Sequence, residues 1–426
     1  MTASNPGGQC ILPGTMVNGQ PATLGVMGGG QLGRMFVQAA QRMGYFTAVL
    51  DPDPASPAGL VSHHHIQTAY LDEQGLAQLM QRSSAITTEF ENVPAPALLT
   101  LGAHRPVAPA ADAVAIAQDR AKEKAHFTRC GVPCAPYAVI ETAAQLAAIL
   151  AGEPSAAPGR PKQASAPSGG SAVHEVTSVG ADLFPGILKT TRLGYDGKGQ
   201  MRVKTRAELA AAWAELKNVP CVLEKMLPLK AECSVIVARG RDGSMVNFPV
   251  QLNLHREGIL AVTEVHEGNL PSALASQAVD AAKSIAQGLQ YVGVLCVEFF
   301  VLQDNSLVVN EMAPRPHNSG HYTLDACDQS QFDLQVRTLA GLPLVQPRAY
   351  CPSIMLNLLG DLWLAFDDSP PWDQVLALPG THLHLYGKLQ ASRGRKMGHL
   401  NITGASVAEV RATALAAAKL LGIEPF

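Results

Sequence analysis

The sequence predicts an α/β protein built from several domains, and three observations support that prediction. The chain has 426 residues, which leaves room for two or three domains with ample core. Residues 22–54 follow the order strand, glycine-rich turn, helix, strand, which is typical of a βαβ unit. Residues 291–313 contain two apolar strands joined by a short turn, which is typical of a β-hairpin. A parallel unit and an antiparallel unit in one chain indicate more than one sheet.

Composition argues against several classes of protein. Hydrophobic residues make up 47% and charged residues 16% of the chain, and no apolar run is long enough to span a membrane, so a soluble protein is expected. The net charge of -3 argues against bulk binding to nucleic acid. The eight cysteines form no C-x-x-C pair, which favours reduced thiols in the cytoplasm over disulfides or a zinc site. Residues 1–21 lack the features of a signal peptide and are expected to form a flexible leader.

The glycine turn of the βαβ unit allows two interpretations. Gly28, Gly30 and Gly33 fit the pattern G-x-G-x-x-G, and Asp51 ends the next strand where a dinucleotide fold has its ribose-binding acid. This favours a nicotinamide-dependent dehydrogenase. However, any βαβ unit that brings a phosphate to a helix N-terminus needs small residues at this turn. A phosphate or ribose subsite is therefore the second interpretation.

Two polar segments follow in the same domain. The histidines at 63–65 cannot all face one point in regular structure, so a solvated loop is favoured over a metal site. A strand at residues 84–88 brings Glu89 and Glu91 to its carboxyl end, which is where ligands bind in open α/β sheets. A polar loop explains these two acids equally well.

A second domain is expected to begin with the amphipathic helix that opens at residues 118–124. Ala, Gly, Ser and Pro account for 18 of the 23 residues at 151–173, a composition that predicts a disordered insertion. A strand ending at Lys189 then leads into a glycine-rich, cationic loop at 194–200. Such a hairpin loop can close over phosphates and exclude water, although an ordinary glycine hairpin tip has the same composition. It is not a Walker A motif.

The C-terminal half supplies further polar candidates. The segment 224–227 follows an apolar strand and is predicted to form a hinge whose backbone binds a purine edge. Glu232 and His255 lie on strands that face the same region, although either could be an ordinary sheet residue. The donor-rich segment 315–321 is a polar loop or a solvated turn. Four basic residues within 388–396 suit a phosphate monoester, although basic surface turns are common.

The hairpin at 291–313 carries the strongest chemical signal. A two-residue turn at Asp304 and Asn305 places Glu298 directly opposite Glu311. Like charges at this spacing destabilise a sheet, so a divalent cation such as Mg²⁺ is expected between them. A shared proton and a solvated edge hairpin are the alternatives. Regular alternation of side chains points Asn310 away from Glu311.

These motifs, in this order, resemble the ATP-grasp superfamily. Within it, GGGQLGRM, TTEFENVP, GYDGKGQ, NEMAPRPHNSGHYT and RGRKMGH resemble the N5-carboxyaminoimidazole ribonucleotide synthetase family. The resemblance implies a three-domain ATP-grasp fold. A βαβ pre-ATP-grasp domain would span 22–118 and a small flap domain 119–222. A C-terminal mixed-sheet domain with the substrate-phosphate region would span 223–426.

The resemblance also implies an activity. Such enzymes are ligases of purine biosynthesis that use ATP to phosphorylate bicarbonate. The resulting carboxyphosphate carboxylates the amine of 5-aminoimidazole ribonucleotide, which yields the N5-carboxy product, ADP and phosphate. ATP, Mg²⁺ and a cytoplasmic homodimer are implied. Alternatives are a biotin carboxylase-like or formate-using ATP-grasp ligase, the nicotinamide-dependent dehydrogenase, and a non-catalytic nucleotide-binding regulator. The chain departs from the family at Leu193, where many relatives have glycine, and in its longer 151–173 insertion.

Residue roles follow from the same resemblance. ATP would be bound by Arg120, Lys189, Gly194, Tyr195, Asp196, Gly197, Lys198, Gly199, Gln200, Glu224, Lys225, Met226, Leu227, Glu232, His255, Asn310 and Glu311. Mg²⁺ would be bound by Glu298 and Glu311. The substrate would contact Gly30, Gln31, Leu32, Glu89, Asn318, Ser319, Lys388 and Arg395. The residues implied in catalysis are Tyr195, Asp196, His255 and Arg315.

Overall fold

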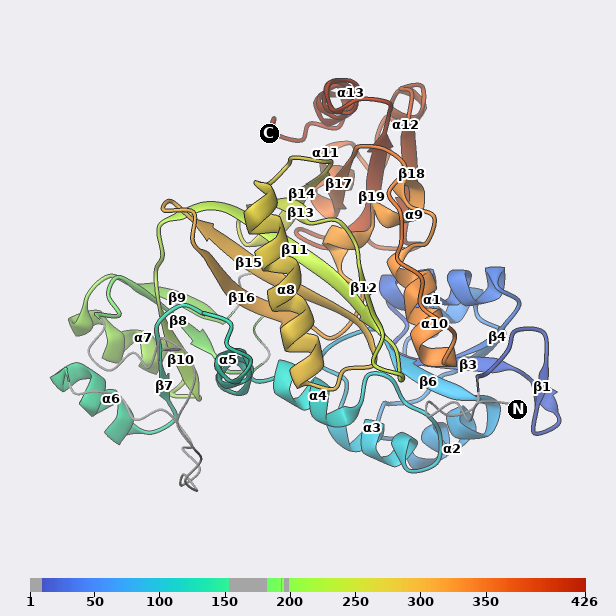
Figure 1. The fold of residues 1–426 in the computed structure, drawn as a ribbon, viewed down its shortest axis with the longest axis horizontal. Helices are drawn as coiled ribbons and strands as arrows, with labels where there is room; N and C mark the ends of the chain where they lie inside the picture. Colours follow the sequence, from blue (N-terminus) through green and yellow to red (C-terminus); the bar gives the residue numbers. More distant parts are fainter. Residues whose placement is uncertain (1–9, 153–181, 193, 195–198) are drawn as a thin grey trace.

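The computed structural model describes residues 10–152, 182–192, 194 and 199–426, arranged as three domains (Figure 1). The N-terminal domain is a parallel sheet in the order β5-β4-β3-β6. Its strands are β3 (Thr23–Met27), β4 (Phe46–Leu50), β5 (His64–Ile66) and β6 (Ala85–Thr88). Its helices are α1 (Gln31–Arg42), η1 (Gly59–Val61), α2 (Glu73–Arg82), α3 (Ala95–Gly102) and α4 (Ala111–Ala117). The predicted solvated loop at 63–65 is wrong, because His64 and His65 belong to β5.

Residues 10–21 are ordered against the rest of the molecule. The short strands β1 (Met16–Val17) and β2 (Gln20–Pro21) pair with each other. Ile11 is buried, its N–H donates to the carbonyl of Ala340, and its own carbonyl accepts from the hydroxyl of Tyr45. The prediction of a flexible leader is therefore wrong for residues 10–21, and residues 1–9 lie outside the described part of the chain.

The small domain is an antiparallel sheet in the order β7-β10-β8-β9. Its elements are β7 (Tyr137–Ile140), α6 (Ala143–Ala151), β8 (Gly186–Thr190), β9 (Gln200–Val203), η2 (Arg206–Glu208), α7 (Leu209–Glu215) and β10 (Cys221–Lys225). Apolar side chains of α6 and α7 pack on one face of this sheet. The predicted border between residues 222 and 223 falls inside β10 and is wrong. The predicted insertion begins with the last residue of α6, and its part from 153 onward lies outside the described residues.

The large domain is a nine-stranded sheet in the order β16-β15-β11-β13-β14-β17-β19-β18, with β12 paired to β11. Its strands are β11 (Leu229–Arg239), β12 (Met245–Asn247), β13 (Gln251–Arg256), β14 (Ile259–Val265), β15 (Gly293–Leu302), β16 (Leu307–Ala313), β17 (Ser353–Leu359), β18 (Thr381–Leu385) and β19 (Lys396–Thr403). All of these pairings are antiparallel, so parallel and antiparallel pairing are divided between domains rather than mixed within this sheet.

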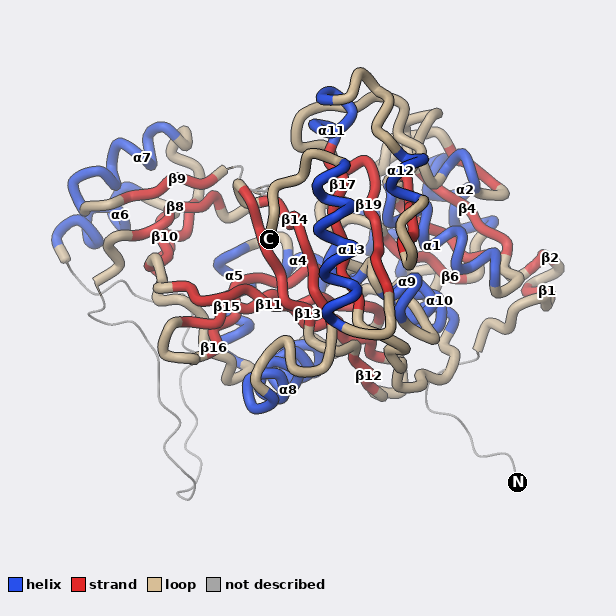
Figure 2. Tube along the Cα trace, turned by 90° about the horizontal axis from the view of Figure 1, so that it is seen from above, coloured by secondary structure: helices blue, strands red, loops and turns tan. Residues whose placement is uncertain are grey.

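Helices cover both faces of the large sheet. They are α5 (Arg120–Arg129), α8 (Ser272–Gly288), η3 (Asn318–Gly320), α9 (Thr323–Ala326), α10 (Gln331–Ala340), α11 (Gly360–Ala365), α12 (Trp372–Leu376) and α13 (Val407–Leu420). Figure 2 shows the small sheet and the N-terminal domain on opposite sides of the large sheet. No helix in the described part of the chain is long and apolar enough to cross a membrane.

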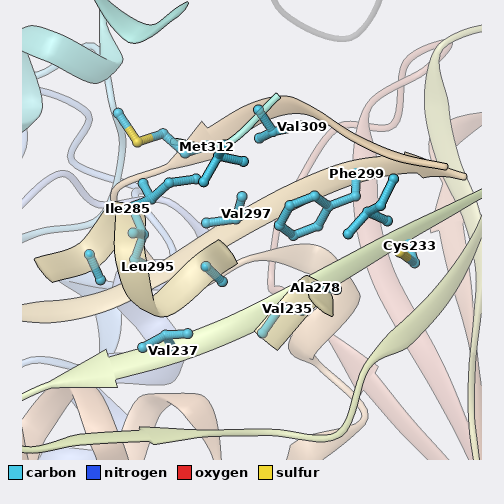
Figure 3. Close-up of a cluster of buried hydrophobic side chains, with 14 of the residues drawn as sticks. Cys233, Val235, Val237, Ala278, Ile285, Leu295, Val297, Phe299, Val309 and Met312 are labelled. Carbon is cyan, nitrogen blue, oxygen red and sulfur yellow. The ribbon is translucent and has the colours of Figure 1, made fainter. Parts of the chain in front are cut away.

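The apolar face of β15 determines which of its side chains are available for chemistry. Leu295, Val297 and Phe299 point toward α8 and pack with alternate residues of β11 and β16 (Figure 3). Because side chains alternate along a strand, Glu298 lies on the opposite face. Its directly paired neighbours are both polar, namely Ser234 of β11 and Glu311 of β16. Because the apolar side chains of β15 pack under α8, Glu298 points to the other face of the sheet, where the cavity lies.

The hairpin β15–β16 differs from the prediction in two ways that cancel. Its turn has three residues rather than two, because the N–H of Leu302 donates to the carbonyl of Ser306, with Asn305 at φ +63°. Asn310 is then an extra residue, since Phe299 pairs with Val309 while Glu298 pairs with Glu311. This β-bulge restores the register that the longer turn had shifted. The predicted two-residue turn is wrong, and the predicted pairing of the two glutamates is confirmed.

Candidate active site

A cavity of about 560 Å³ opens where the three domains meet. The N-terminal domain contributes Glu91, helix α5 contributes Arg120, and the small sheet contributes Lys189. The large sheet contributes its polar face, including Glu298 and Glu311. The cavity walls are mainly polar and carry both signs of charge, so the site suits a charged, hydrophilic ligand.

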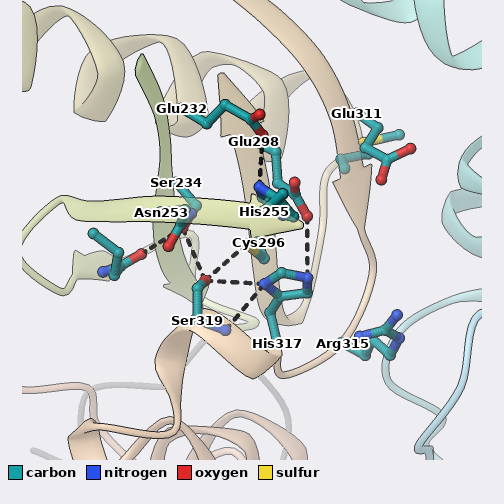
Figure 4. Close-up of polar contacts among 12 residues, drawn as sticks. Glu232, Ser234, Asn253, His255, Cys296, Glu298, Glu311, Arg315, His317 and Ser319 are labelled. Carbon is teal, nitrogen blue, oxygen red and sulfur yellow. Dashed lines mark hydrogen bonds and ion pairs between the residues drawn. The ribbon is translucent and has the colours of Figure 1, made fainter. Parts of the chain in front are cut away.

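Each of the paired carboxylates has a nitrogen donor as its partner. Glu298 accepts from Nε2 of His317 at 3.0 Å, and Glu311 accepts from Nη1 of Arg120 at 2.9 Å. Burial would raise the pKa of Glu298, but the neighbouring His317, His255 and Arg315 hold that pKa well below its usual range. Figure 4 shows both carboxylates and the partners of Glu298. Glu298 is therefore ionised at neutral pH.

His317 is held in one orientation by Ser319. The N–H of Ser319 donates to Nδ1 of His317 at 3.3 Å, and the Ser319 hydroxyl lies 2.9 Å from the same nitrogen. With Nδ1 accepting, Nε2 carries the proton and points at Glu298. Ser319 is completely buried and bonded to Ser234 at 2.8 Å (Figure 4). The expectation that Ser319 contacts substrate is wrong, because it lies behind His317.

Glu232 and His255 form a second ion pair in the cavity wall. Nδ1 of His255 lies 2.6 Å from a carboxylate oxygen of Glu232. Burial would lower the pKa of His255, but the hydrogen bond and charge of Glu232 raise it. Both residues line the cavity, as does the neighbouring Glu257.

The small domain contributes a lysine that lines the cavity and a buried glutamate that binds two lysines. Lys189 lines the cavity, and its ammonium group lies 3.0 Å from Glu224. Lys124 of α5 contacts the other oxygen of Glu224 at 3.2 Å. Burial would raise the pKa of Glu224, but these lysines lower it to about 2. Both carboxylate oxygens of Glu224 are thus bonded to lysines.

The hinge after β10 has less free backbone than predicted. The N–H of Lys225 donates to Pro136, and the N–H of Met226 donates to Pro185. These two amides are therefore unavailable to a purine edge, and that part of the hinge prediction is wrong. The carbonyl groups of this segment remain possible acceptors for a purine amine.

The glycine loop of the small domain is described only in part. Gly194 and Gln200 line the cavity, and Gly199, directly before β9, has φ +71°. Nη2 of Arg120 lies 3.4 Å from the carbonyl of Gly194. Leu193, Tyr195, Asp196, Gly197 and Lys198 lie outside the described residues.

On the N-terminal side, Glu91 pairs with Arg315. Both residues are more than two-thirds buried, and both line the cavity. Burial would raise the pKa of Glu91, but Arg315 lowers it to about 2. Arg315 follows β16 directly, so the hairpin sets the position of this guanidinium as well as that of Glu311.

Two asparagines present unsatisfied amide groups. Asn318 is 7% exposed, and within the described residues neither its Oδ1 nor its Nδ2 has a hydrogen-bond partner. Oδ1 of Asn310 is buried and likewise without a partner there. Both side chains line the cavity. Asn310 does so because it is the bulged residue, so the prediction that it points away from Glu311 is wrong.

The oxygen atoms near the hairpin suit a hard divalent cation. Glu298 and Glu311 offer carboxylates, and Asn310 offers an amide oxygen, which is the donor set that Mg²⁺ takes in proteins. The two carboxylates do not complete a metal site by themselves: within the described ranges no three His, Cys, Asp or Glu side chains gather in a group able to hold a metal ion. The residues present therefore fit Mg²⁺ held jointly with a phosphate ligand.

The backbone N–H groups of the glycine turn in the N-terminal domain are occupied by two acidic side chains of the same domain. Glu89 accepts from the N–H groups of Gly30 at 2.9 Å and Gly33 at 3.1 Å. Asp51 accepts from the N–H of Gly29 at 2.7 Å and from the hydroxyl of Tyr70 at 2.6 Å. The dinucleotide interpretation is therefore wrong. The acid expected to bind a ribose, Asp51, accepts from Gly29, and the amides expected to bind a phosphate donate to Glu89.

The predicted phosphate contacts near α1 need the same correction. The amide of Gly30 is occupied by Glu89, and the side chain of Leu32 belongs to the apolar core. A Cβ atom on residue 30 would approach a Glu89 oxygen to 2.5 Å, which explains why glycine is required there. Burial raises the pKa of Glu89. This turn therefore offers the carboxyl group of Glu89 rather than a row of free amides.

The basic C-terminal segment lies close to Glu89. Lys388 donates to the carbonyl of Lys396 at 2.6 Å. Burial, with help from Arg395, lowers the pKa of Lys388 to about 8, while the charge of Glu89 acts in the opposite direction. Arg395 is exposed and donates to the carbonyl of Gln390. Lys396 lines the cavity and was not among the assigned site residues.

Three more residues lie at or next to the cavity although the family resemblance implied no role for them. Glu123 and Lys124 lie three and four positions after Arg120, on the same face of α5. Glu91 follows Glu89 by two positions. Helical spacing could have identified the first two, whereas the partner of Glu91 is 224 positions away in the sequence. No local pattern reveals such a pair.

Comparisons with known proteins match most of the chain in three parts. Models of the ribonucleotide synthetase preATP-grasp domain, the ATP-grasp domain and the phosphoribosylaminoimidazole carboxylase C-terminal domain match residues 21–118, 171–332 and 353–413. The chain is 40% identical over 385 residues to the N5-carboxyaminoimidazole ribonucleotide synthase of Brucella melitensis, covering 89% of this chain and 95% of that protein. Identity to the Bacillus subtilis enzyme of the same name is 38% over 392 residues, or 92% of each chain.

Solved structures agree with the sequence matches. One is the ADP complex of an N5-carboxyaminoimidazole ribonucleotide synthetase, with a TM-score of 0.80, 36% identity, and coverage of 96% of this chain and 97% of that one. Another is the N5-carboxyaminoimidazole synthase of Aspergillus clavatus in complex with ADP and 5-aminoimidazole ribonucleotide. Its TM-score is 0.79 at 29% identity, with coverage of 94% and 98%.

Proposed function

The chain belongs to the N5-carboxyaminoimidazole ribonucleotide synthase family, and from this premise we propose how its cavity residues divide the chemistry. It is an ATP-dependent carbon–nitrogen ligase with the three-domain ATP-grasp fold. It carboxylates the amine of 5-aminoimidazole ribonucleotide with bicarbonate in purine biosynthesis. The dehydrogenase, the regulator and the other ATP-grasp ligases considered from the sequence are therefore set aside.

The observation that carries the proposal is the facing pair Glu298 and Glu311 in a cavity that also receives Lys189 and Arg120. Glu298, Glu311 and Asn310 would hold Mg²⁺. When bound, Mg²⁺ supplies positive charge to the triphosphate during phosphoryl transfer. Arg120 then has two tasks, because it contacts both Glu311 and the carbonyl of Gly194. It links the metal-binding strand to the base of the glycine loop.

ATP is proposed to lie between the small sheet and the large sheet. Lys189, Gly194 and Gln200 face the cavity from one side, and Glu232 with His255 faces it from the other. Glycine-loop residues 195–198 would complete the phosphate contacts, with Gly199 as the hinge. Carboxyphosphate is destroyed by water, so closure of this loop protects the reaction.

The chemistry has two bond exchanges. A bicarbonate oxygen forms a bond to the γ-phosphorus as the bond to the bridging oxygen breaks and ADP leaves. The amine nitrogen then forms a bond to the carboxyl carbon as the carbon–oxygen bond to phosphate breaks. The amine gives up a proton, and phosphate leaves. Positive and polar groups that stabilise the negative charge of these species are Arg315, oriented by Glu91, and the amide of Asn318.

The ribonucleotide is proposed to bind between Glu89 and the segment 388–396. Lys388 and Arg395 offer cationic groups to its phosphate, and Glu89 offers an acceptor to its hydroxyl groups. Tyr195 and Asp196 would meet the aminoimidazole ring from the glycine loop. We also propose a cytoplasmic location, in keeping with the eight free thiols, and a homodimer, which the family resemblance implies.

The test is a coupled ADP-release assay with the ribonucleotide and bicarbonate each omitted in turn. Release that depends on both, and that is lost in Glu298→Gln and Glu311→Gln, is the expected result. Release that ignores the ribonucleotide would contradict the proposal. Light scattering after size exclusion tests the dimer.

A further inference from the structure

Glu123 is a buried carboxylate for which the proposed reaction has no use. It lies on α5, is 2% exposed, and reaches the wall of the cavity. Its Oε1 accepts from the backbone N–H of Met312 at 2.7 Å. Burying an acidic side chain is costly unless it is hydrogen-bonded, so this buried acid suggests a task.

That task concerns the edge of the large sheet. Strand β16 is the edge strand, so the N–H groups on its outer side have no strand to pair with. The α5 segment satisfies two of them: Pro133 accepts from Val309 at 2.9 Å, and Glu123 accepts from Met312. These two anchors bracket the bulged residue Asn310 and the adjacent Glu311. The bulge is thus held from outside at both ends.

The same face of α5 also binds a side chain of β16, that of Glu311. Arg120, one turn before Glu123, binds the carboxylate of Glu311 at 2.9 Å. One turn of α5 therefore fixes both the backbone and the side chain of the metal-binding strand. Without the outer anchor, an edge strand with an extra residue has more than one way to pair.

We infer that Glu123 is a positioning residue that holds the β16 bulge, so that Asn310 and Glu311 both face the cavity. This inference rests on the proposed metal site. The rival role is direct binding of the metal ion by Glu123. The hydrogen bond to Met312 requires an acceptor oxygen at that place, whereas metal binding by a carboxylate requires its charge.

The two roles separate in a pair of variants of similar size. Glu123→Gln keeps the acceptor oxygen and loses the charge, and Glu123→Met loses both. Binding of Mn²⁺ to the protein–ADP complex is measured by electron paramagnetic resonance. Glu123→Gln is expected to bind Mn²⁺ within about twofold of the wild type, and Glu123→Met about tenfold more weakly, as is usual for outer-shell changes. The KM for the ribonucleotide should stay unchanged in both.

A control separates positioning from loss of stability. Val410→Ala removes buried apolar volume from α13, far in sequence from α5, and should lower the melting temperature without changing Mn²⁺ affinity. Equal impairment of the Gln and Met variants would overturn the inference in favour of a ligand role. Unchanged Mn²⁺ affinity in Glu123→Met would also overturn it. If the wild-type ADP complex itself binds no Mn²⁺, the proposed metal site fails, and faster hydrogen exchange at Met312 in Glu123→Met would still report the anchor.

Discussion

At the scale of single residues, Asn318 shows how a side chain can be kept for a ligand at a cost to the free protein. Its amide is buried, and neither of its polar atoms has a partner within the described residues. A buried, unsatisfied polar group costs about 1–3 kcal/mol. That cost is recovered only when a substrate supplies the missing hydrogen bonds.

Replacing Asn318 should therefore separate stability from activity. In Asn318→Ala the free energy of unfolding, measured with urea, is expected to be unchanged or higher. The value of kcat/KM is expected to fall about 100-fold, because a site built for hydrogen bonds loses both of them. Ser319→Ala is the matched control, since it breaks satisfied bonds to Ser234 and His317 and should lower stability. A large loss of stability in Asn318→Ala would show that its amide has an internal role.

Lys388 predicts a pH dependence of substrate binding. Its pKa is lowered to about 8, chiefly by burial, so the ammonium form is present below that pH and is lost above it. The KM for the ribonucleotide should therefore rise as pH increases through about 8, if the charge binds the phosphate. Lys388→Arg should remove this rise, because arginine stays protonated. Lys419→Arg on the exposed side of α13 is the control, and steady-state kinetics from pH 7 to pH 9.5 is the measurement.

At the scale of elements, the hairpin shows how a correct contact was predicted from an incorrect turn. The residues Asp304 and Asn305 indicate a turn, and the separation of Glu298 from Glu311 suits a regular hairpin. A three-residue turn followed by one bulged residue uses the same number of residues. Turn composition alone does not distinguish these two solutions, because Asn accepts the left-handed conformation in both.

Asn305 offers a test of the observed turn. It lies at φ +63°, where a residue with a Cβ atom other than Asn or Asp pays about 1–2 kcal/mol. Asn305→Ala should lower the free energy of unfolding by about 1 kcal/mol, and Asn305→Gly should restore most of it. Both variants lose the exposed hydrogen bond from Lys230. The difference between their free energies of unfolding therefore reports the cost of the backbone conformation at residue 305. Equal stability of the two variants in urea would contradict the assigned conformation.

The glycine turn shows a limit of motif reading at the same scale. Three glycines and an acid at the right distance suit a dinucleotide, yet the amides bind Glu89 and Asp51. A helix N-terminus attracts any anion, and a carboxylate of the protein satisfies it as well as a phosphate does. The order of strands and helices in this domain was predictable from hydrophobic patterns. The identity of the anion depends on Glu89, which is distant in sequence.

At the scale of the whole molecule, α5 connects the large sheet to the small sheet. It packs beside β16, and its Lys124 reaches Glu224 on β10, which also binds Lys189. Both lysines approach one carboxylate, so the position of the cavity-lining Lys189 depends on Lys124 of another domain. The three domains could be anticipated from motif order, but this link could not, because its bonded pairs are 35 and 100 residues apart.

Removing the contact between Lys124 and Glu224 should lower both the free energy of unfolding and the affinity for ATP. Lys124→Met leaves Glu224 with Lys189 as its remaining lysine, and the free energy of unfolding is expected to fall by about 1–3 kcal/mol. Lys189 is then drawn more tightly to Glu224, so the KM for ATP should rise while the KM for the ribonucleotide does not. Lys122→Met, at an exposed position of the same helix, is the control. Unchanged ATP kinetics in Lys124→Met would show that Lys189 is positioned by other contacts.

The three-residue tip and the bulge of the β15–β16 hairpin also depend on each other. If the bulge were lost while the tip kept three residues, Glu298 would face Asn310, and Glu311 would turn into the apolar layer under α8. At the present number of residues, the bulge can be lost without this change only if the tip shortens to two residues. Relatives with a hairpin of the same length and no bulge are therefore expected to carry the shorter tip.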